Sequence, residues 1–453
     1  MKLSRKLAWL VLALTALMLW SAAIRHVYDG GKQLGWLATP LRAFASFPST
    51  VKQALSQATL VPITYLPTPA DFRPVQRLDT PLWVLRSRYQ GEQWEVVMQD
   101  LSSGEVRRSW PIMGEAEARL RAEPSSLLLH SFRPAPDELI VSNHRGSLVR
   151  LDAEGEMIWC YDSMGTHHSL NPDAEGYLWT PAMERNEAGE YLPRHYTIGN
   201  EIRPYLDESL LALDPATGTT HYRASLTELL AANGLLSVID RAANPVDPFH
   251  LNDIEPALYD SEYFQQGDVF VSLCTSSTIL HIRPRTGHVL RVIRGPFSFQ
   301  HDVDILSDHE ISLFDNGRAE GDFLEWHHNL LMGGSQLTFA PDAPLRLRDT
   351  ARHSRLLIYD LATGRFRAPL DSVFRRQQIF TPYGGLAERL PGGDWLVEEA
   401  DEAIYWVLNQ DGVRLKRMVP TPLAGYHHYA SWVRVVADPT QADWPVVSGR
   451  PSH

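Results

Sequence analysis

The sequence predicts an all-β fold, a six-bladed β-propeller, that follows an N-terminal transmembrane helix. Three observations lead to this prediction: an apolar segment of helix length near the N-terminus, a hairpin turn that occurs six times in related forms, and histidines that recur ahead of short apolar runs. Equivalent positions of a repeat fold lie around one axis. Histidines that are far apart in the sequence are therefore expected to meet in space.

The apolar segment comprises residues 7–24. It follows three basic residues, Lys2, Arg5 and Lys6. A helix of about 18 residues can just cross the hydrocarbon core of a bilayer, and basic residues ahead of it keep the N-terminus in the cytoplasm. Residues 1–25 are thus expected to be a cytoplasmic start and a single-pass anchor in the inner membrane, with the rest of the chain in the periplasm. The alternative is a signal peptide that is cleaved at Ser21-Ala22-Ala23.

Residues 26–68 are expected to form a juxtamembrane connector, and residues 69–453 the propeller. Within the second range, Asp and Gly supply turn chemistry between apolar alternating runs. The six turns are Asp100–Gly104, Asp152–Gly155, Asp214–Gly218, Pro284–Gly287, Asp360–Gly364 and Asn409–Gly412. A four-stranded blade needs about 40–50 residues, so the wider turn spacings indicate inserted loops. Two β-sandwich domains are the alternative architecture.

Three insertions stand out, and loops on one face of such a fold commonly wall its site. Residues 183–208 are charged and rich in tyrosine, and residues 317–354 end in several arginines. Residues 225–239 are expected to be helical, because Ser225-Leu-Thr-Glu228 is a capping box ahead of an apolar run.

The composition is that of a globular protein, with 44% hydrophobic and 21% charged residues. The net charge, 42 − 54 = −12, argues against nucleic acid as a partner. The two cysteines, Cys160 and Cys274, are interpreted as buried free thiols or as one disulfide. They are not in CxxC spacing, which argues against a thiolate metal site. No metal site and no cofactor are expected.

Four histidines are expected to line one pocket at a mouth of the propeller, since each stands just before a predicted inner strand. They are His168, His250, His301 and His428. An imidazole can attack an electrophile when a neighbour holds its other nitrogen, and Asp302 or Asp304 could hold that of His301. The candidates for substrate contacts are His428, Asn252, Arg434 and Cys274. His130 is interpreted as structural.

The amino-acid sequence around these histidines resembles that of the bacterial arylsulfotransferase family. The resemblance extends over about residues 90–436, and its motifs are residues 167–179, 249–256, 299–306 with 311–316, and 383–399. It implies a periplasmic six-bladed propeller that moves a sulfuryl group from an aryl sulfate ester to a phenol or another hydroxyl acceptor. The nucleophile that becomes sulfated would be His301. His250 and His168 would stabilise sulfuryl oxygens and shuttle the phenol proton.

One departure from the family concerns the cations of the site. Relatives carry an arginine where this chain has Cys274, and a neutral thiol contributes little to binding sulfuryl oxygens. Three arginines could replace it, namely Arg434, Arg185 and Arg318.

Three rival functions remain open at this point. The departure at Cys274 and the anchor favour a non-catalytic propeller that serves as an envelope scaffold or binding subunit and contacts other envelope proteins. A metal-dependent enzyme is less favoured, because no HxH or HExxH motif is present. A quinone-dependent dehydrogenase propeller usually has more blades than the six units found here.

Overall fold

A computed structural model describes most of the chain beyond the N-terminal segment. The described residues are Trp20, Pro62, 64–91, 93–120, 128–186, 191–198, 201–318, 352–430 and 432–445. The chain divides into two units, residues 1–62 with 325–343 and residues 63–324 with 344–453, and every helix and strand named below belongs to the second unit.

The predicted membrane anchor, residues 7–24, lies outside the described residues apart from Trp20. Among the residues that are described, no helix is long and apolar enough to cross a membrane. The insertion at residues 317–354 is described only at its two ends. Regular structure begins at Tyr65, within the segment predicted to be the connector, because β1 (Tyr65–Pro67) pairs with β28 (Tyr426–His428).

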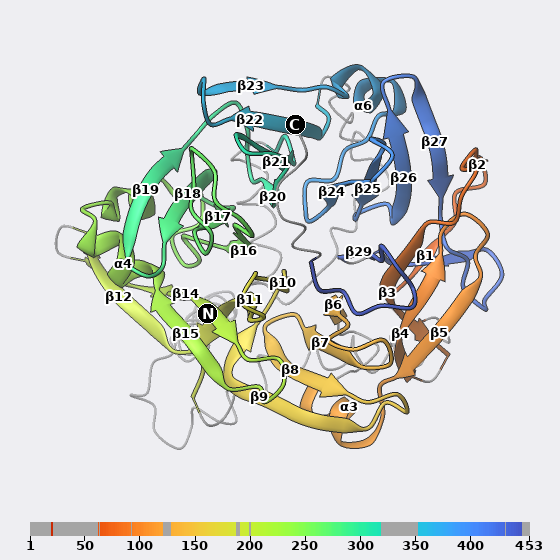
Figure 1. Cartoon of the computed structure of the whole chain (residues 1–453), viewed down its shortest axis with the longest axis horizontal. Helices are drawn as coiled ribbons and strands as arrows, with labels where there is room; N and C mark the ends of the chain where they lie inside the picture. Colours follow the sequence, from red (N-terminus) through yellow and green to blue (C-terminus); the bar gives the residue numbers. More distant parts are fainter. Residues whose placement is uncertain are drawn as a thin grey trace, which may run out of the picture. The chain divides into compact units, whose positions relative to one another are not determined.

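The second unit has a propeller-like arrangement of antiparallel sheets around a common centre (Figure 1). This confirms the all-β propeller prediction at the level of architecture. Four sheets are separate blades. One contains β16 (Leu251–Pro256), β17 (Val269–Leu273), β18 (Thr278–Arg283) and β19 (His288–Ile293); the next contains β20 (His301–Ile305), β21 (Glu310–Asp315), β22 (Arg355–Asp360) and β23 (Arg365–Arg367).

The other two separate blades involve the ends of the described chain. One contains β24 (Leu386–Arg389), β25 (Trp395–Glu399), β26 (Ile404–Asn409) and β27 (Gly412–Arg417), with β2 (Val75–Gln76) at its edge. The other contains β29 (Arg434–Val435), β3 (Trp83–Gln90), β4 (Gln93–Asp100) and β5 (Val106–Pro111). In the last sheet a late strand pairs with early ones, so this pairing closes the ring.

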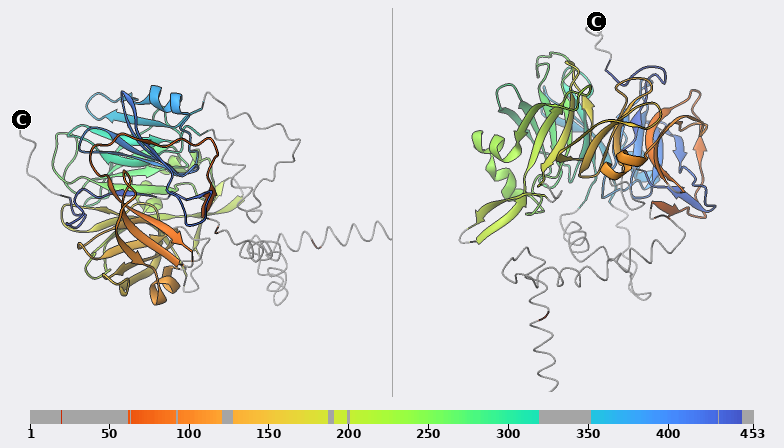
Figure 2. Two further views of the ribbon diagram at one scale, coloured as in Figure 1. Left: turned by 90° about the vertical axis from the view of Figure 1, so that its right-hand side faces the viewer. Right: turned by 90° about the horizontal axis from the view of Figure 1, so that it is seen from below.

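An eight-stranded sheet occupies the remaining part of the ring. It contains β6 (Leu128–Phe132), β7 (Leu139–Asn143), β8 (Gly146–Leu151), β9 (Met157–Thr166), β10 (Asn171–Pro172), β11 (Leu178–Glu184), β14 (Glu208–Leu213) and β15 (Thr220–Ser225). One half of this sheet contains β6 to β9, and the other contains β10, β11, β14 and β15. The two halves are joined at one place, where the end of β9 pairs with the end of β11. The hairpin of β12 (Pro193–Ile198) and β13 (Glu201–Leu206) forms a separate sheet. It is the yellow-green pair that extends from the ring in Figure 2.

All six predicted turns join consecutive strands, and their geometry explains why Asp and Gly occur there. At three of them the glycine N–H donates to the backbone oxygen of the aspartate four residues earlier at 2.8 Å, namely Asp100, Asp214 and Asp360. The same aspartate side chains accept from the N–H two residues on, at 2.7–2.8 Å. Gly104 has φ of 91°, which strongly favours glycine.

The predicted capping box begins a helix, α4 (Leu226–Ala232). The Ser225 hydroxyl accepts from the Glu228 N–H at 3.1 Å. The helix is shorter than predicted, because Gly234 adopts φ of 67° and a 3-10 helix, η2 (Leu236–Arg241), follows. The other helices among the described residues are α3 (Gly114–Leu120) and α6 (Asp371–Gln377).

Carboxylates tie the inner strands of neighbouring sheets to one another. Asp253 Oδ2 on β16 accepts from the Val303 N–H on β20 at 2.7 Å, and Asp302 Oδ2 on β20 accepts from the Ala387 N–H on β24 at 2.7 Å. Glu398 on β25 accepts from Val433 N–H at 2.9 Å, next to β29. These bonds fix the starts of the inner strands, where the candidate site lies.

Candidate active site

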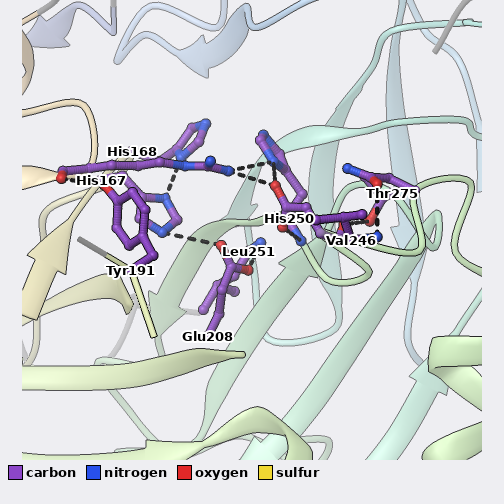
Figure 3. Close-up of polar contacts among 11 residues, drawn as sticks. His167, His168, Tyr191, Glu208, Val246, His250, Leu251 and Thr275 are labelled. Carbon is purple, nitrogen blue, oxygen red and sulfur yellow. Dashed lines mark hydrogen bonds and ion pairs between the residues drawn. The ribbon is translucent and has the colours of Figure 1, made fainter. Parts of the chain in front are cut away.

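Three of the predicted histidines meet at the starts of three inner strands. The ring of His168 lies 5.2 Å from that of His250 and 6.1 Å from that of His301, measured between centroids. His168 and His301 are buried and the His250 side chain is 15% exposed. The rings of His168 and His250 meet edge to face, at an interplanar angle of 79°, and Figure 3 shows both residues in the cluster. The indole of Trp432 adjoins the cluster, 5.2 Å from His168 and 5.9 Å from His301.

The His301 ring is held through Nδ1. This nitrogen lies 2.8 Å from Asn316 Oδ1 and 3.1 Å from the Phe299 carbonyl oxygen. The Asn316 amide cannot be turned around, because its Nδ2 donates to the carbonyls of Thr381 at 2.7 Å and Gly384 at 2.6 Å. Two acceptors at Nδ1 require a proton there, so Nε2 keeps its lone pair.

Burial lowers the pKa of His301 to about 4, against the opposing effect of its bond to Asn316. The ring is therefore neutral at pH 7, as a nucleophile must be. The prediction that Asp302 or Asp304 holds the ring was wrong. Asp302 instead accepts from the Ala387 N–H on the next blade, because it is the extra residue at a register shift in β20, between His301 and Val303, and has φ of 54°.

His250 is held by a carboxylate. Its Nδ1 lies 2.8 Å from Asp247 Oδ2, and the same oxygen accepts from Arg145 Nη2 at 2.6 Å. Burial acts to raise the pKa of Asp247, but the Arg145 and His250 charges outweigh it and leave the pKa below its usual value. Asp247 is thus an anion that orients the His250 ring.

His168 contacts a second histidine. Its Nδ1 lies 2.7 Å from His167 Nδ1, and His167 Nε2 lies 3.2 Å from Glu208 Oε1 on the far side (Figure 3). Burial lowers the pKa of both rings well below the usual value of histidine. The prediction selected His168 alone from this pair, whereas the structure gives His167 a place directly behind it.

Of the three arginines that could replace the family arginine at position 274, Arg318 is the one that approaches the cluster. Its guanidinium lies over the rings of Phe299, at 4.8 Å, and Tyr383, at 4.2 Å. After burial, the charge of Arg318 is among the causes that affect the pKa of both His301 and Cys274. Arg185 instead donates to the carbonyls of Asp162 and Met164.

Cys274 lies next to His250, since its N–H donates to the His250 carbonyl at 3.2 Å. Burial raises the pKa of its thiol, so the group is neutral and supplies no charge to the site. Both Cys160 and Cys274 are free thiols in the structure.

Asn252 connects two of the histidine segments. Its Nδ2 donates to the Gln300 carbonyl at 2.8 Å, next to His301. Its buried Oδ1 has no hydrogen-bond partner among the described residues. Arg434 donates to the carbonyls of Ser131, at 2.8 Å, and Leu170. These bonds tie β29 to its neighbours. Because the guanidinium of Arg434 is used in them, nothing in its contacts supports the predicted role in substrate binding.

His428 is not placed with the other predicted histidines. Its ring packs against Tyr65, with centroids 5.3 Å apart, because β28 pairs with β1 and not with an inner strand. The residue that reaches the cluster from the closing blade is Trp432, just before β29. His130 accepts from the Leu170 N–H at 3.3 Å, which agrees with a structural role.

Five residues that complete the site were not predicted. They are Arg145, His167, Glu208, Asp247 and Trp432. Asp247 stands three residues before His250, and this spacing in the Asp-Pro-Phe-His segment was a usable signal. In the part of the chain that is described, no group of three or more His, Cys, Asp or Glu side chains could hold a metal ion.

The fold and the site define a propeller-like protein with a cluster of histidines beside arginines. The sequence profile of the arylsulfotransferase (ASST) family matches residues 138–413, and the chain belongs to this family. The match implies an aryl sulfate donor and a hydroxyl acceptor at a general level. No curated protein matches the chain in sequence.

Solved structures similar to this chain are distant in sequence. A protein of unknown function from Bacteroides caccae is 9% identical with a TM-score of 0.47, and the alignment covers 79% of this chain and all of that one (100%). TolB from Acinetobacter baumannii is 12% identical, with a TM-score of 0.37 and coverage of 88% and 72%. Virginiamycin B lyase from Staphylococcus aureus is 8% identical, with a TM-score of 0.33 and coverage of 78% and 89%.

Proposed function

We propose that this protein transfers a sulfuryl group from an aryl sulfate ester to a phenolic or other hydroxyl acceptor through a sulfated His301. The observation that carries the proposal is the state of the His301 ring. Asn316 and the Phe299 carbonyl hold the proton on Nδ1, and burial keeps the ring neutral, so Nε2 presents a lone pair.

The reaction has two steps. In the first, His301 Nε2 attacks sulfur, the bond between sulfur and the aryl oxygen breaks, and the phenolate takes a proton as it leaves. In the second, an acceptor hydroxyl loses its proton, attacks the same sulfur and releases Nε2. His168 and His250, whose rings adjoin this site, supply and remove the proton.

The sulfuryl oxygens need positive or strongly donating groups around them. Arg318 and the group of Arg145, Asp247 and His250 meet this need in the proposed mechanism. Cys274 occupies the place of the missing arginine without replacing its charge.

The test is the intact mass of the full chain after incubation with 4-nitrophenyl sulfate. We expect a gain of one sulfuryl group that is lost on adding a phenol. His301→Ala should prevent the gain, whereas His288→Ala, which changes an exposed histidine on β19, should not. A wild-type protein that folds but never gains mass would favour the envelope scaffold function instead.

We further propose that the eight-stranded sheet consists of two blades, which makes six in all. Two of the six turns lie in this sheet, one between β8 and β9 and one between β14 and β15. Both β6 and β10 lie near the centre of the ring (Figure 1), as inner strands do.

Residues 7–24 are proposed to anchor the chain in the inner membrane, with the propeller, residues 69–453, in the periplasm. The proposal rests on the basic start and the apolar length of this segment. Membrane fractionation and the mass of the mature N-terminus test it. A mature chain that begins near Ile24 and is released by osmotic shock would show cleavage instead.

A further inference from the structure

Behind His168 lies a chain of two further titratable side chains that the proposed mechanism does not yet use. His168 Nδ1 lies 2.7 Å from His167 Nδ1. His167 Nε2 lies 3.2 Å from Glu208 Oε1. The three side chains thus form one line from β14 to the histidine cluster (Figure 3).

Glu208 has a second bond that orients it. Its Oε2 accepts from the Leu251 N–H, the residue after His250, and its side chain is fully buried. One carboxyl oxygen is therefore fixed towards the backbone of β16, and the other faces His167. Oε1 and His167 Nε2 are both buried and neither has a hydrogen-bond partner of good geometry among the described residues, so their 3.2 Å approach is the one place where a proton of Glu208 can be passed along the line.

The charges around the line favour an uncharged starting state. Burial, together with the nearby Asp247 carboxylate, raises the pKa of Glu208 well above its usual value, although Arg145 opposes this. Burial lowers the pKa of His167, and Arg145, His144 and His250 lower it further while Asp247 acts in the opposite direction. Glu208 is then a neutral acid and His167 a neutral ring. Asp207 also lies close enough to influence Glu208.

We propose that Glu208 and His167 form a proton relay that switches His168 between a proton donor and a proton acceptor at Nε2. The inference rests on the proposed sulfuryl transfer for its chemical purpose. Glu208 and His167 are positioning residues, since they act through His168 and do not touch the substrate.

The proton movements balance in both steps. When the phenolate leaves, His168 gives it the Nε2 proton, His167 gives its Nδ1 proton to His168 Nδ1, and Glu208 gives its proton to His167 Nε2. The carboxylate that forms keeps its bond from the Leu251 N–H and faces the Arg145 charge. When the acceptor attacks, its hydroxyl proton enters at His168 Nε2 and each transfer runs backwards.

The activity test compares two donors in the full chain. Phenyl sulfate has a basic leaving group that needs a proton, whereas 4-nitrophenyl sulfate has a weakly basic one that does not. Glu208→Gln should lower kcat/KM for phenyl sulfate by about 10- to 100-fold, which is within the usual contribution of acid–base catalysis. Its kcat/KM for 4-nitrophenyl sulfate should stay within about threefold of the wild-type value. His167→Gln should give the same pattern, and the double variant should be no slower than either single one.

Asp207→Asn is the matched control, because it changes the adjacent carboxylate, which binds Ser225 and Thr227 rather than His167. It should leave the ratio of the two donors unchanged even where the melting temperature falls. Equal slowing of both donors by Glu208→Gln would indicate a structural role only and overturn the relay.

A second readout does not depend on activity. In Glu208→Gln the amide oxygen must accept from the Leu251 N–H, so its NH2 group donates to His167 Nε2 and fixes His168 with the proton on Nε2. With Glu208 protonated, ¹⁵N NMR shifts of the two rings should show this same tautomer in both proteins. As the pH is raised until Glu208 ionises, the wild type should move the proton of His168 to Nδ1, whereas Glu208→Gln should keep it on Nε2. Identical shifts in both proteins over the whole pH range in which they stay folded would overturn the relay, even where the wild type transfers sulfuryl groups. Wild-type protein that is inert to both donors, yet shows the tautomer change, would overturn only the proposed function.

Discussion

The His301 ring is held by an amide, not by a carboxylate, and this choice affects its reactivity. A carboxylate at Nδ1 would favour the charged imidazolium and raise the pKa of the ring. Asn316 accepts the same proton without a full negative charge. Burial then dominates, and the ring stays neutral with an available Nε2. His250, by contrast, has its Nδ1 held by the carboxylate of Asp247.

The pH dependence of sulfation should reflect this. Since burial lowers the pKa of His301 to about 4, the neutral form predominates above that pH and the charged form below it. The rate of sulfation by 4-nitrophenyl sulfate should thus fall about tenfold per pH unit only below about pH 4. Rapid quenching in base, which converts the released 4-nitrophenol to its coloured anion, measures the rate, with fluorescence at each pH as a control for folding. An acid limb near pH 6.5 would contradict the prediction.

Arg318 should matter more than the other arginines named from the sequence. Its guanidinium lies over Tyr383 and affects His301. Arg318→Gln should lower the rate of sulfation by about 100- to 1,000-fold, as loss of one donor to a developing charge does elsewhere. Arg185→Gln, at a residue bound to the carbonyls of Asp162 and Met164, should change it little. Equal rates for the wild type and Arg318→Gln would show that the charge comes from another group.

The sequence alone identified the three clustered histidines because each precedes an inner strand. It did not identify their partners, since these come from other blades or from loops of irregular length. Glu208 is separated from His167 by the β12–β13 insertion. Trp432 was not predicted, because its blade has no histidine at this place and the nearest histidine in the sequence, His428, lies on β28.

At the scale of elements, the segments that lead into the inner strands share a backbone feature. One or two residues before or at the start of each strand adopt the left-handed region, with φ of 58° at His168, 42° at His250, 57° at Phe299, 54° at Asp302 and 48° at Trp432. Such a residue turns the chain sharply as it enters the strand. The feature aims side chains of different blades at one place, and it costs free energy in any residue but glycine.

Substitutions at Asp302 can measure this cost. Both Asp302→Ala and Asp302→Gly remove the bond to the Ala387 N–H, but only alanine retains the strain of a side chain at positive φ. Asp302→Ala should therefore be less stable than Asp302→Gly by about 1–2 kcal/mol, measured by urea unfolding of the full chain. An alanine variant as stable as the glycine variant would show that the conformation is not strained.

The turn chemistry was predictable from the sequence because it is local. Asp and Gly at fixed offsets determine a hairpin without help from the rest of the chain. The pairings of β9 with β11 and of β1 with β28 depend instead on distant residues. No local pattern in residues 157–184 or 65–67 indicates them.

At the scale of the whole second unit, the C-terminal segment helps to hold the ring closed. β29 pairs with β3. Eight residues after the end of β29, Asp443 binds Arg133, just after β6, with Oδ1 2.7 Å from Nη2. Both side chains are buried, with 1% and 6% exposure. Arg133 also donates to the carbonyls of Asp438 and Pro439. The closing segment is thus fastened to two sheets, so the sheets should unfold together.

Removal of the Asp443 carboxylate should weaken this closure strongly. Asp443→Ala leaves the buried Arg133 guanidinium without its anion, and breaking such a pair costs about 3–5 kcal/mol. Urea unfolding followed by tryptophan fluorescence should show one transition at a lower midpoint. Asp79→Ala is the control, because Asp79 is 92% exposed and faces Arg414 at 3.3 Å, and loss of such a surface pair costs at most about 1 kcal/mol. If Asp443→Ala were no less stable than Asp79→Ala, the ring would be held by strand pairing and the apolar contacts between sheets alone.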